Sequence, residues 1–471
     1  MSKTREIVIT PTTRIEGNGK VAIILDDQGN VSEAYFQATE VRGFEYFLRG
    51  MEAEKLPFTI SRICGVCSTA HMIASVKTIE NICSTEITET AQKIRELLLM
   101  GQIISNHSLV FYFLILPDFW FPLKEDPSKR NIFQIMREKP EIGKKALKLR
   151  SFGTNILNII GGREVHIISL IPGGLIKPIT EKNRKILLEQ ANDACALTQE
   201  ALSLGKTLFE KNWDELKTLT DCCETSYMGM ISDNAPNYYQ GKVHLINSKG
   251  NLLEKFSEEN FFEHIQEESS PWTYSKSAFY KGLNLEDRIM QVGPTARMNV
   301  SKKISTELAN EELKYFKAKF GTPAHDTLII DYARLIDLLY SCERARELLE
   351  EEKITRSDVR VPIKIKAGKG VGIVEAPRGT LAHQYTLTRT GKLRNMRLII
   401  PTQINNEAIN MSIKSIASKF IRNGEVKEGF LNRVEMFVRA YDPCIKCATR
   451  LVNNNIVIEI RDLNGKIIKT I

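Results

Sequence analysis

The chain has 471 residues, of which 42% are hydrophobic and 26% charged, a composition typical of a globular protein with a large core. Its 65 basic and 57 acidic residues leave a net charge of only +8, so no nucleic-acid partner is indicated. No apolar run approaches the roughly 20 residues that a membrane span needs, and the first residues lack the apolar core of a signal peptide. We expect a cytoplasmic protein with no transmembrane segment of its own, unless a partner attaches it to a membrane or exports it.

Residues 1–60 predict a small antiparallel sheet that leads into a short helix. Apolar runs at 6–9 and 21–25 are followed by a polar hairpin signal at 26–30. The loop between the two runs carries a lone acid, Glu16. The first cysteine pair comes after the short helix.

Helices are predicted wherever apolar residues recur at three- and four-residue spacing. The longest such pattern runs from about 66 to 118, where Pro117 and Asp118 are expected to stop it. The other helical patterns lie at 141–160, 180–211, 301–319, 329–350, 406–421 and 427–440.

Strands are predicted where short runs are apolar or alternate between apolar and polar residues. Such runs lie at 242–246, 359–366, 368–375, 383–388 and 396–400, and two more flank Asn464-Gly465. No internal repeat or low-complexity linker interrupts the chain, so we expect one interlocked, helix-rich α+β body with small antiparallel sheets. Its segments are an N-terminal β region (1–60), a helical core with the first cysteine pair (61–211), a mixed polar insert (212–300), helices (301–358), a β/α region with the second pair (359–450) and a C-terminal extension (451–471).

Two Cys-x-x-Cys pairs, Cys64/Cys67 and Cys444/Cys447, lie near opposite ends of the chain. The total of nine cysteines is odd and irregularly spaced, which does not indicate a disulfide framework. Brought together, the two pairs would make a four-thiolate pocket for nickel, iron, zinc or copper(I). Proline after Asp442 is expected to hold that residue extended, which presets the turn into the second pair. The residues alone leave a structural zinc as open as a redox metal.

Six spaced motifs make a resemblance to a known family. In chain order they are Thr13-Arg-Ile-Glu-Gly, Arg42-Gly-Phe-Glu, Arg62-x-Cys-Gly-x-Cys-x-x-x-His, Glu375-Ala-Pro-Arg-Gly, Pro401-Thr with Asn405, and Asp442-Pro-Cys-x-x-Cys. Through them the chain, from about residue 8 to 450, resembles the large subunit of nickel–iron hydrogenases. The resemblance implies that subunit's fold and the reversible reaction H2 ⇌ 2H+ + 2e−.

The resemblance also implies a bimetallic centre. Cys64 and Cys444 would be terminal nickel ligands, and Cys67 and Cys447 would bridge nickel to an iron that carries carbon monoxide and cyanide. Heterolytic cleavage of H2 needs a soft, electron-rich metal beside a base, and a thiolate can serve as ligand and as base.

Several other roles are implied by position in the family motifs. Glu16 would carry the first proton, Arg378 would bond a cyanide over the open face, and Thr402 would donate to the other cyanide. Pro377 and Pro401 would wall the iron pocket. Without the resemblance these residues would be a loop carboxylate, a surface salt bridge and turn residues.

Weaker matches surround the same site. His71 would bond a bridging sulfur, or else be a buried structural histidine. Asn106 stands near the place where many relatives have an aspartate, and His107 follows it, although helical core packing explains both equally well. Asp442 belongs to the motif of the second pair.

At Arg450 the chain departs from many relatives. They carry a histidine there, which binds a magnesium-type ion together with the acid matching Glu45 and the backbone carbonyl matching Leu398. A guanidinium cannot ligate a cation. We therefore expect a Glu45–Arg450 salt bridge in place of this candidate divalent site.

The chain also runs 21 residues beyond Arg450. In most relatives a protease removes such a tail after nickel insertion, so we expect cleavage between Arg450 and Leu451. The implied partners are this maturation protease, nickel-insertion proteins and an iron–sulfur small subunit, because no other cysteine cluster could pass electrons on. Two alternatives stay open: a hydrogenase-like H2-sensing regulatory subunit, and a zinc-stapled scaffold without redox chemistry.

Overall fold

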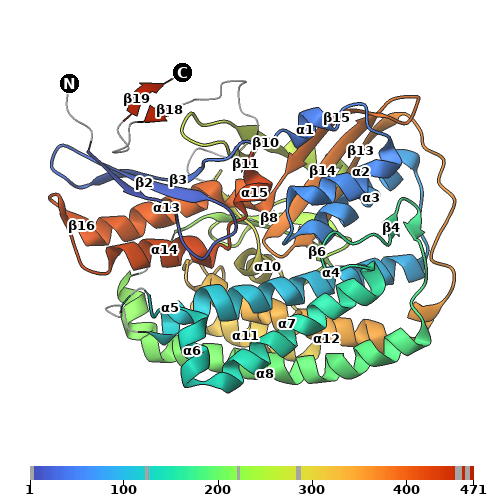
Figure 1. Cartoon of the computed structure of the whole chain (residues 1–471), viewed down its shortest axis with the longest axis horizontal. Helices are drawn as coiled ribbons and strands as arrows, with labels where there is room; N and C mark the ends of the chain where they lie inside the picture. Colours follow the sequence, from blue (N-terminus) through green and yellow to red (C-terminus); the bar gives the residue numbers. More distant parts are fainter. Residues whose placement is uncertain are drawn as a thin grey trace.

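The computed structural model describes residues 5–121, 126, 128–219, 223–282, 288–450, 459–461 and 467–470. Figure 1 shows long helices along one side and two small sheets with shorter helices on the other. The largest hydrophobic cluster extends in sequence from Ile9 to Cys447 and includes both cysteine pairs. Segments from all parts of the chain therefore share one core.

The long helices are α4 (Glu89–Leu109), α7 (Pro140–Gly161), α8 (Glu181–Leu219), α11 (Glu307–Phe320) and α12 (Ile329–Glu350). Helix α4 packs on α7 and α12, and α12 also packs on α8 and α11. Their three- and four-residue apolar spacing gives each helix a face to bury, as the sequence predicts.

The predicted helix at 66–118 is several elements in the structure. It consists of α3 (Ser68–Cys83), α4, a π-helical segment (Val110–Ile115) and α5 (Leu116–Trp120). The prediction that Pro117 stops the helix is wrong, because proline stands in the first turn of α5, where its missing N–H costs nothing. Among the described residues, the helical run Glu89–Trp120 is long and apolar enough to cross a membrane, but 78% of its most apolar window is buried inside the protein.

The N-terminal antiparallel sheet is confirmed. It comprises β1 (Arg5–Ile9), β2 (Gly19–Leu25) and β3 (Val31–Ala38) in the order β1-β2-β3. Helix α13 (Pro401–Phe420) packs on β3, and α14 (Phe430–Ala440) packs on α13. The beginning of the chain therefore lies against its C-terminal helices (Figure 1).

A second antiparallel sheet consists of β13 (Gly368–Ala376), β14 (Gly379–Leu387) and β15 (Leu393–Ile399). A two-residue turn, Pro377-Arg378, joins β13 to β14, because Ala376 pairs directly with Gly379. Helix α3 packs across β13 and β14. This contact brings the first cysteine pair and the Pro377-Arg378 turn toward the same place.

The segment 359–366 is not the predicted strand. Arg360 forms only an isolated bridge to Gly174, although Val361 N–H donates to Gly173 O. Alternation gives an extended backbone, but the partner strand β5 (Gly174–Leu175) is too short for a ladder.

The polar middle of the chain builds a sheet in the order β12-β6-β8-β9, with β7 beside β6, and the strand predicted at 242–246 is β8. The two runs predicted in the tail are β18 and β19, and Asn464-Gly465 lies outside the described residues. The remaining helices are α1 (Phe44–Phe47), α2 (Leu56–Ile60), α6 (Ile132–Glu138), α9 (Phe261–His264), α10 (Pro294–Val300) and α15 (Ile445–Ala448). The remaining strands are β4 (Leu170–Ile171), β6 (Ser226–Ser232), β7 (Ala235–Pro236), β8 (Lys242–Ile246), β9 (Leu252–Phe256), β10 (Ile265–Glu268), β11 (Ser277–Tyr280), β12 (Met290–Gln291), β16 (Ile421–Arg422), β17 (Glu425–Val426), β18 (Glu459–Arg461) and β19 (Ile467–Thr470).

Candidate metal centre

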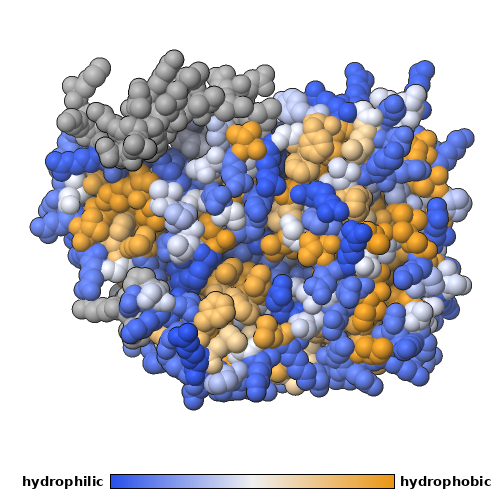
Figure 2. Space-filling model, in the orientation of Figure 1, coloured by the Kyte–Doolittle hydropathy of each residue, from blue (hydrophilic) through white to orange (hydrophobic). Residues whose placement is uncertain are grey.

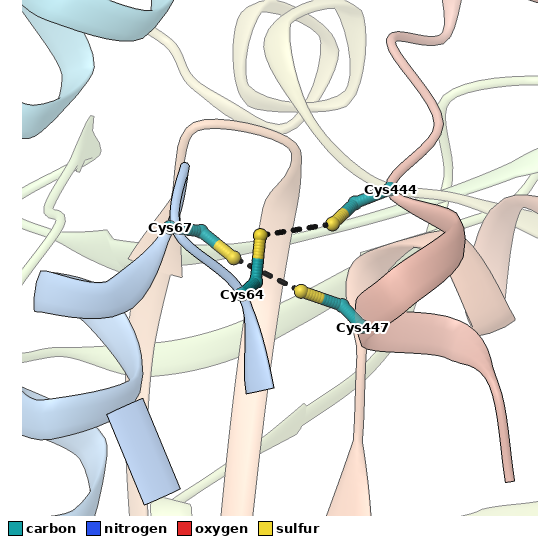
Figure 3. A group of neighbouring side chains, drawn as sticks. All are labelled: Cys64, Cys67, Cys444 and Cys447. Atoms are coloured by element: carbon teal, nitrogen blue, oxygen red, sulfur yellow. Dashed lines mark hydrogen bonds between the residues drawn. The ribbon is translucent and has the colours of Figure 1, made fainter. Parts of the chain in front are cut away.

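The two cysteine pairs meet in the core. Cys64 Sγ lies 3.4 Å from Cys444 Sγ, Cys67 Sγ lies 3.0 Å from Cys447 Sγ, and all four sulfurs lie within 4.8 Å of one another (Figure 3). None of the four residues is more than 5% exposed. Helix α3 begins directly after Cys67, and α15 begins directly after Cys444. Each pair thus spans the start of a helix.

Four thiols in so buried a place cannot all ionise unless a cation is present. Burial raises the pKa of the Cys444 and Cys447 thiols well above the ordinary value. A soft metal ion compensates four thiolates, and Arg378 adds a fixed positive charge. The donor set therefore fits a thiolate-bound metal.

The backbone of the second pair is tied to the Glu16 loop. Ile445 N–H donates to Glu16 O at 3.2 Å, and Glu16 forms an isolated parallel bridge with Cys444. The expected extended conformation of Asp442 is wrong, because its φ is +48°. Its side chain and carbonyl hold Arg378, which compensates for a left-handed backbone that aspartate tolerates better than most residues.

Glu16 lies between a sulfur and the protein surface. Its Oε2 is 3.2 Å from Cys444 Sγ and accepts the N–H of Lys446 at 3.1 Å. Its side chain is 12% exposed, and Lys446 Nζ lies 3.8 Å away on the outer side. Burial, and next the negative charge of Cys64, raises the pKa of Glu16. A carboxylate so placed can take a proton from the centre.

Arg378 reaches the centre from the turn between β13 and β14. Its Nη2 donates to Asp442 Oδ1 at 2.8 Å and its Nε donates to Asp442 O at 2.5 Å, whereas its buried Nη1 has no hydrogen-bond partner. Burial opposes the charge, but Asp442 and the thiolates raise the pKa of Arg378 well above its ordinary value. Nη1 thus remains available to an anionic group beside the sulfurs.

A cavity of about 250 Å³ adjoins the sulfurs. Arg378 and Thr402 line it together with apolar residues, and Thr402 Oγ1 accepts the N–H of Cys444 at 3.0 Å. The other residues that line it are Cys67, Cys444, Cys447, His71, Ala376, Pro377, Leu381, Ile400 and Pro401. Its walls are apolar apart from Arg378, Thr402, His71 and the sulfurs, which suits small, weakly hydrated ligands.

His71 and Asn106 reach this site more directly than His107 does. His71 Nε2 lies 3.5 Å from Cys447 Sγ. Asn106 Nδ2 donates to Asp442 Oδ2 at 3.1 Å, opposite the oxygen that holds Arg378. The polar contacts of His107 lead away, because its Nε2 lies 3.4 Å from Asp337 Oδ2.

The expected contact between Glu45 and Arg450 is present. Arg450 Nε lies 3.5 Å from Glu45 Oε1, which also accepts the N–H of Leu398 at 3.3 Å. Arg450 Nη1 donates to Cys447 O at 2.7 Å. The guanidinium therefore occupies the space beside Glu45 and supports the second pair.

Comparisons with known proteins agree with this geometry. The sequence profile described as nickel-dependent hydrogenase matches residues 42–131 and 195–450, and one described as HoxL-like matches residues 6–41. The chain belongs to the nickel-dependent hydrogenase family. It is a large, catalytic subunit, and its enzyme class is that of oxidoreductases acting on H2.

Relatives match this chain over nearly its full length. The F420-non-reducing hydrogenase vhc of Methanococcus voltae has one component that is 35% identical and that aligns over 99% of this chain and 100% of its own length. The beta subunit of the NAD-reducing hydrogenase HoxS of Cupriavidus necator is 31% identical, with 98% and 99% covered. The crystal structure of an NAD+-reducing [NiFe]-hydrogenase in the H2-reduced state has a TM-score of 0.91 at 31% identity, covering 95% of this chain and 100% of that one.

Two residues near the centre escaped the sequence analysis. Arg297, fully buried, pairs with Asp337 and Glu375 and donates to the carbonyls of Ala376 and Pro377. His383 on β14 lies 3.0 Å from His71. The available signal was an ionisable residue within an otherwise buried element, which usually has a specific partner.

Proposed function

We propose that the four cysteines hold a nickel–iron centre, with carbon monoxide and cyanide on the iron, that catalyses H2 ⇌ 2H+ + 2e−. One observation carries this proposal: the two distant pairs converge within 4.8 Å, beside a buried Arg378 Nη1 without a partner. Zinc would need the four sulfurs but not this free donor. When bound, such a centre accepts electrons and polarises H2 so that a neighbouring base can remove a proton.

The chain's own residues then have distinct tasks. Cys64 and Cys444 are assigned as terminal ligands, and Cys67 and Cys447 as bridges. Glu16 accepts a proton at Oε2, beside Cys444 Sγ, and releases it toward the surface near Lys446.

The cavity residues bind the small ligands of the iron. Arg378 Nη1 donates to one cyanide, and Thr402 donates its hydroxyl hydrogen to the other. Pro377 and Pro401 keep water away from the iron, since they contribute only apolar surface to the cavity.

Electrons leave through a partner in this proposal. Over the residues that the structure describes, the four cysteines are the sole metal-binding group found. Exposed apolar side chains lie close to the first pair: a Cβ at Gly65 would lie 3.8 Å from Val165, and Val165, Ile168 and Ile176 are 46%, 41% and 59% exposed. Figure 2 shows hydrophobic residues on this side of the molecule, where Figure 1 places β4.

An iron–sulfur small subunit would cover this surface, which brings its cluster near Cys64 and Cys67. Val165→Glu is then expected to abolish co-purification of that subunit. Leu252→Glu, on the equally exposed Leu252 of β9, is the control. Undiminished binding by the Val165 variant would place the partner elsewhere.

The deciding experiment is metal analysis of the co-purified complex, combined with infrared spectroscopy. We expect one nickel and one iron per chain and the stretching bands of iron-bound carbon monoxide and cyanide. Zinc without nickel would overturn the proposal.

Two further proposals concern the region of Arg450. The Glu45–Arg450 ion pair replaces a divalent ion, so no ordered octahedral ion is expected on Glu45 in a crystal grown with magnesium. Active protein is expected to end at Arg450. Intact mass decides the second proposal, because a nickel-loaded, active chain that retains Ile471 would contradict it.

A further inference from the structure

Four buried side chains form one hydrogen-bonded series that ends on a cysteine of the centre. His71 Nε2 lies 3.5 Å from Cys447 Sγ, and His71 Nδ1 lies 3.0 Å from His383 Nε2. His383 Nδ1 lies 2.8 Å from the hydroxyl of Tyr385. None of the three residues that lead to the sulfur is more than 1% exposed. Each polar atom therefore depends on its neighbour in the series.

A glycine brings the two imidazole rings together. His71 is on α3, and His383 on β14 pairs in register with Gly372 on β13. A Cβ at Gly372 would lie only 2.5 Å from Ala74 O in α3. Because Gly372 has no side chain, α3 can approach the sheet closely enough for the rings to meet.

The direction of each hydrogen bond follows from the sulfur. A metal-bound thiolate carries no proton and only accepts, so the hydrogen must be on His71 Nε2. In a neutral ring Nδ1 then accepts, which requires the hydrogen of His383 to be on Nε2. His383 Nδ1 in turn accepts the hydroxyl hydrogen of Tyr385.

We propose that His383 is a positioning residue for the metal centre: it fixes the tautomer of His71 that donates to Cys447, and Tyr385 fixes His383 in the same way. The inference rests on the proposed function, because it requires Cys447 to be a metal ligand.

The surroundings favour neutral rings. Burial lowers the pKa of His71 to about 4, with Cys64 opposing and Arg450 adding to the effect. Burial, and then His71 and Arg450, lowers the pKa of His383 well below its ordinary value. The guanidinium of Arg450 is therefore a fixed charge that disfavours a second proton on either ring.

The series affects the electron density on the bridging sulfur. A hydrogen bond to a thiolate withdraws charge from it, so the sulfur donates less to the metals. Losing His383 frees His71 to turn or to move its hydrogen to Nδ1, and the bond to Cys447 is lost.

Infrared spectra of the nickel-loaded complex test this inference. In His383→Leu the bands of iron-bound carbon monoxide and cyanide are expected to shift to lower wavenumber, and turnover to fall by about 10-fold or more. In His383→Gln the amide nitrogen can still donate to His71 Nδ1, so the bands should stay near the wild-type positions. Tyr385→Phe should shift them in the same direction as His383→Leu, but less.

The control is His325→Leu, which removes a histidine whose Nδ1 lies 2.8 Å from the hydroxyl of Tyr227, outside the centre. Its spectrum should equal that of the wild type. Unchanged bands in loaded His383→Leu, or an equal shift in His383→Gln, would overturn the inference. Should His383→Leu fail to load metal, the other two variants decide. Wild-type protein without these bands would instead remove the proposed function.

Nitrogen-15 spectra of histidine-labelled complex give a second measurement. The chain has only 7 histidines, so assignment by substitution is feasible. We expect His71 and His383 both to be protonated on Nε2 alone. A hydrogen on Nδ1 of either ring contradicts the inference.

Discussion

Around the four sulfurs, each polar side chain is held by a residue from a distant part of the chain. Asp442, for example, accepts from Arg378 and from Asn106 on its two carboxylate oxygens. Motif spacing predicted which residue types meet here, since both cysteine pairs, Glu16 and Arg378 do converge. It could not predict the left-handed backbone of Asp442 or the place of His383, because these depend on partners far away in the sequence.

Glu16→Gln tests the proton path at the residue scale. The amide keeps the size of the side chain but cannot take a proton, so H2 oxidation is expected to fall about 100-fold or more. Nickel content and infrared bands should stay unchanged. Glu40→Gln, on a nearby loop, serves as the control and should keep full activity. A fully active Glu16→Gln variant would move the proton path elsewhere.

At the scale of elements, sequence periodicity located most helices and the strands of both antiparallel sheets. It failed where a boundary depends on packing, as in the helix expected at 66–118, or where a partner strand is missing, as at 359–366. The three glycines of β13 were visible in the sequence, but their purpose was not. They let α3 lie directly on the sheet that carries Arg378 and His383.

Gly372→Ala should loosen this contact. Its Cβ would lie 2.5 Å from Ala74 O and 2.6 Å from Thr78 N, both of them backbone atoms. Overpacking of this kind costs about 1–3 kcal/mol, and displacement of α3 should lower nickel content as well. Gly43→Ala is the matched control, since no atom lies within 4 Å of its added Cβ. Thermal unfolding and metal analysis compare the two variants, and equal behaviour would refute the close-packing role.

Arg297 secures the turn that carries Arg378. Arg297→Leu leaves Asp337 and Glu375 buried without their cation, which should lower the free energy of unfolding by about 3–5 kcal/mol. In the wild type, burial opposes ionisation but Arg297 and His107 keep the pKa of Asp337 low.

Without Arg297 the pKa of Asp337 rises above its unfolded value, so the folded variant binds a proton that the unfolded chain lacks. Its stability deficit should therefore shrink as the pH falls from about 8 to about 5. Unfolding curves at several pH values measure this trend. A deficit that is constant across the range would contradict it.

At the scale of the whole molecule, the centre joins segments 380 residues apart. A permanent cross-link closing a loop of that length would remove about 6 kcal/mol of chain entropy from the unfolded state. Protein produced without nickel is therefore expected to unfold at a lower temperature than loaded protein. Cys195→Ala, which removes a buried cysteine from outside the centre, should keep this difference. Equal melting temperatures would show that the core, not the metal, holds the segments together.

The separation of the two pairs also determines the order of events during synthesis. A ribosome adding about 5–20 residues per second needs roughly 20–80 seconds to pass from the first pair to the second. Throughout that interval Cys64 and Cys67 are exposed thiols on a nascent chain, and the strand partners of the Glu16 loop have not yet emerged. Assembly of the site is therefore necessarily post-translational, and the newborn chain must be kept from air and from competing metal ions until its final segment arrives.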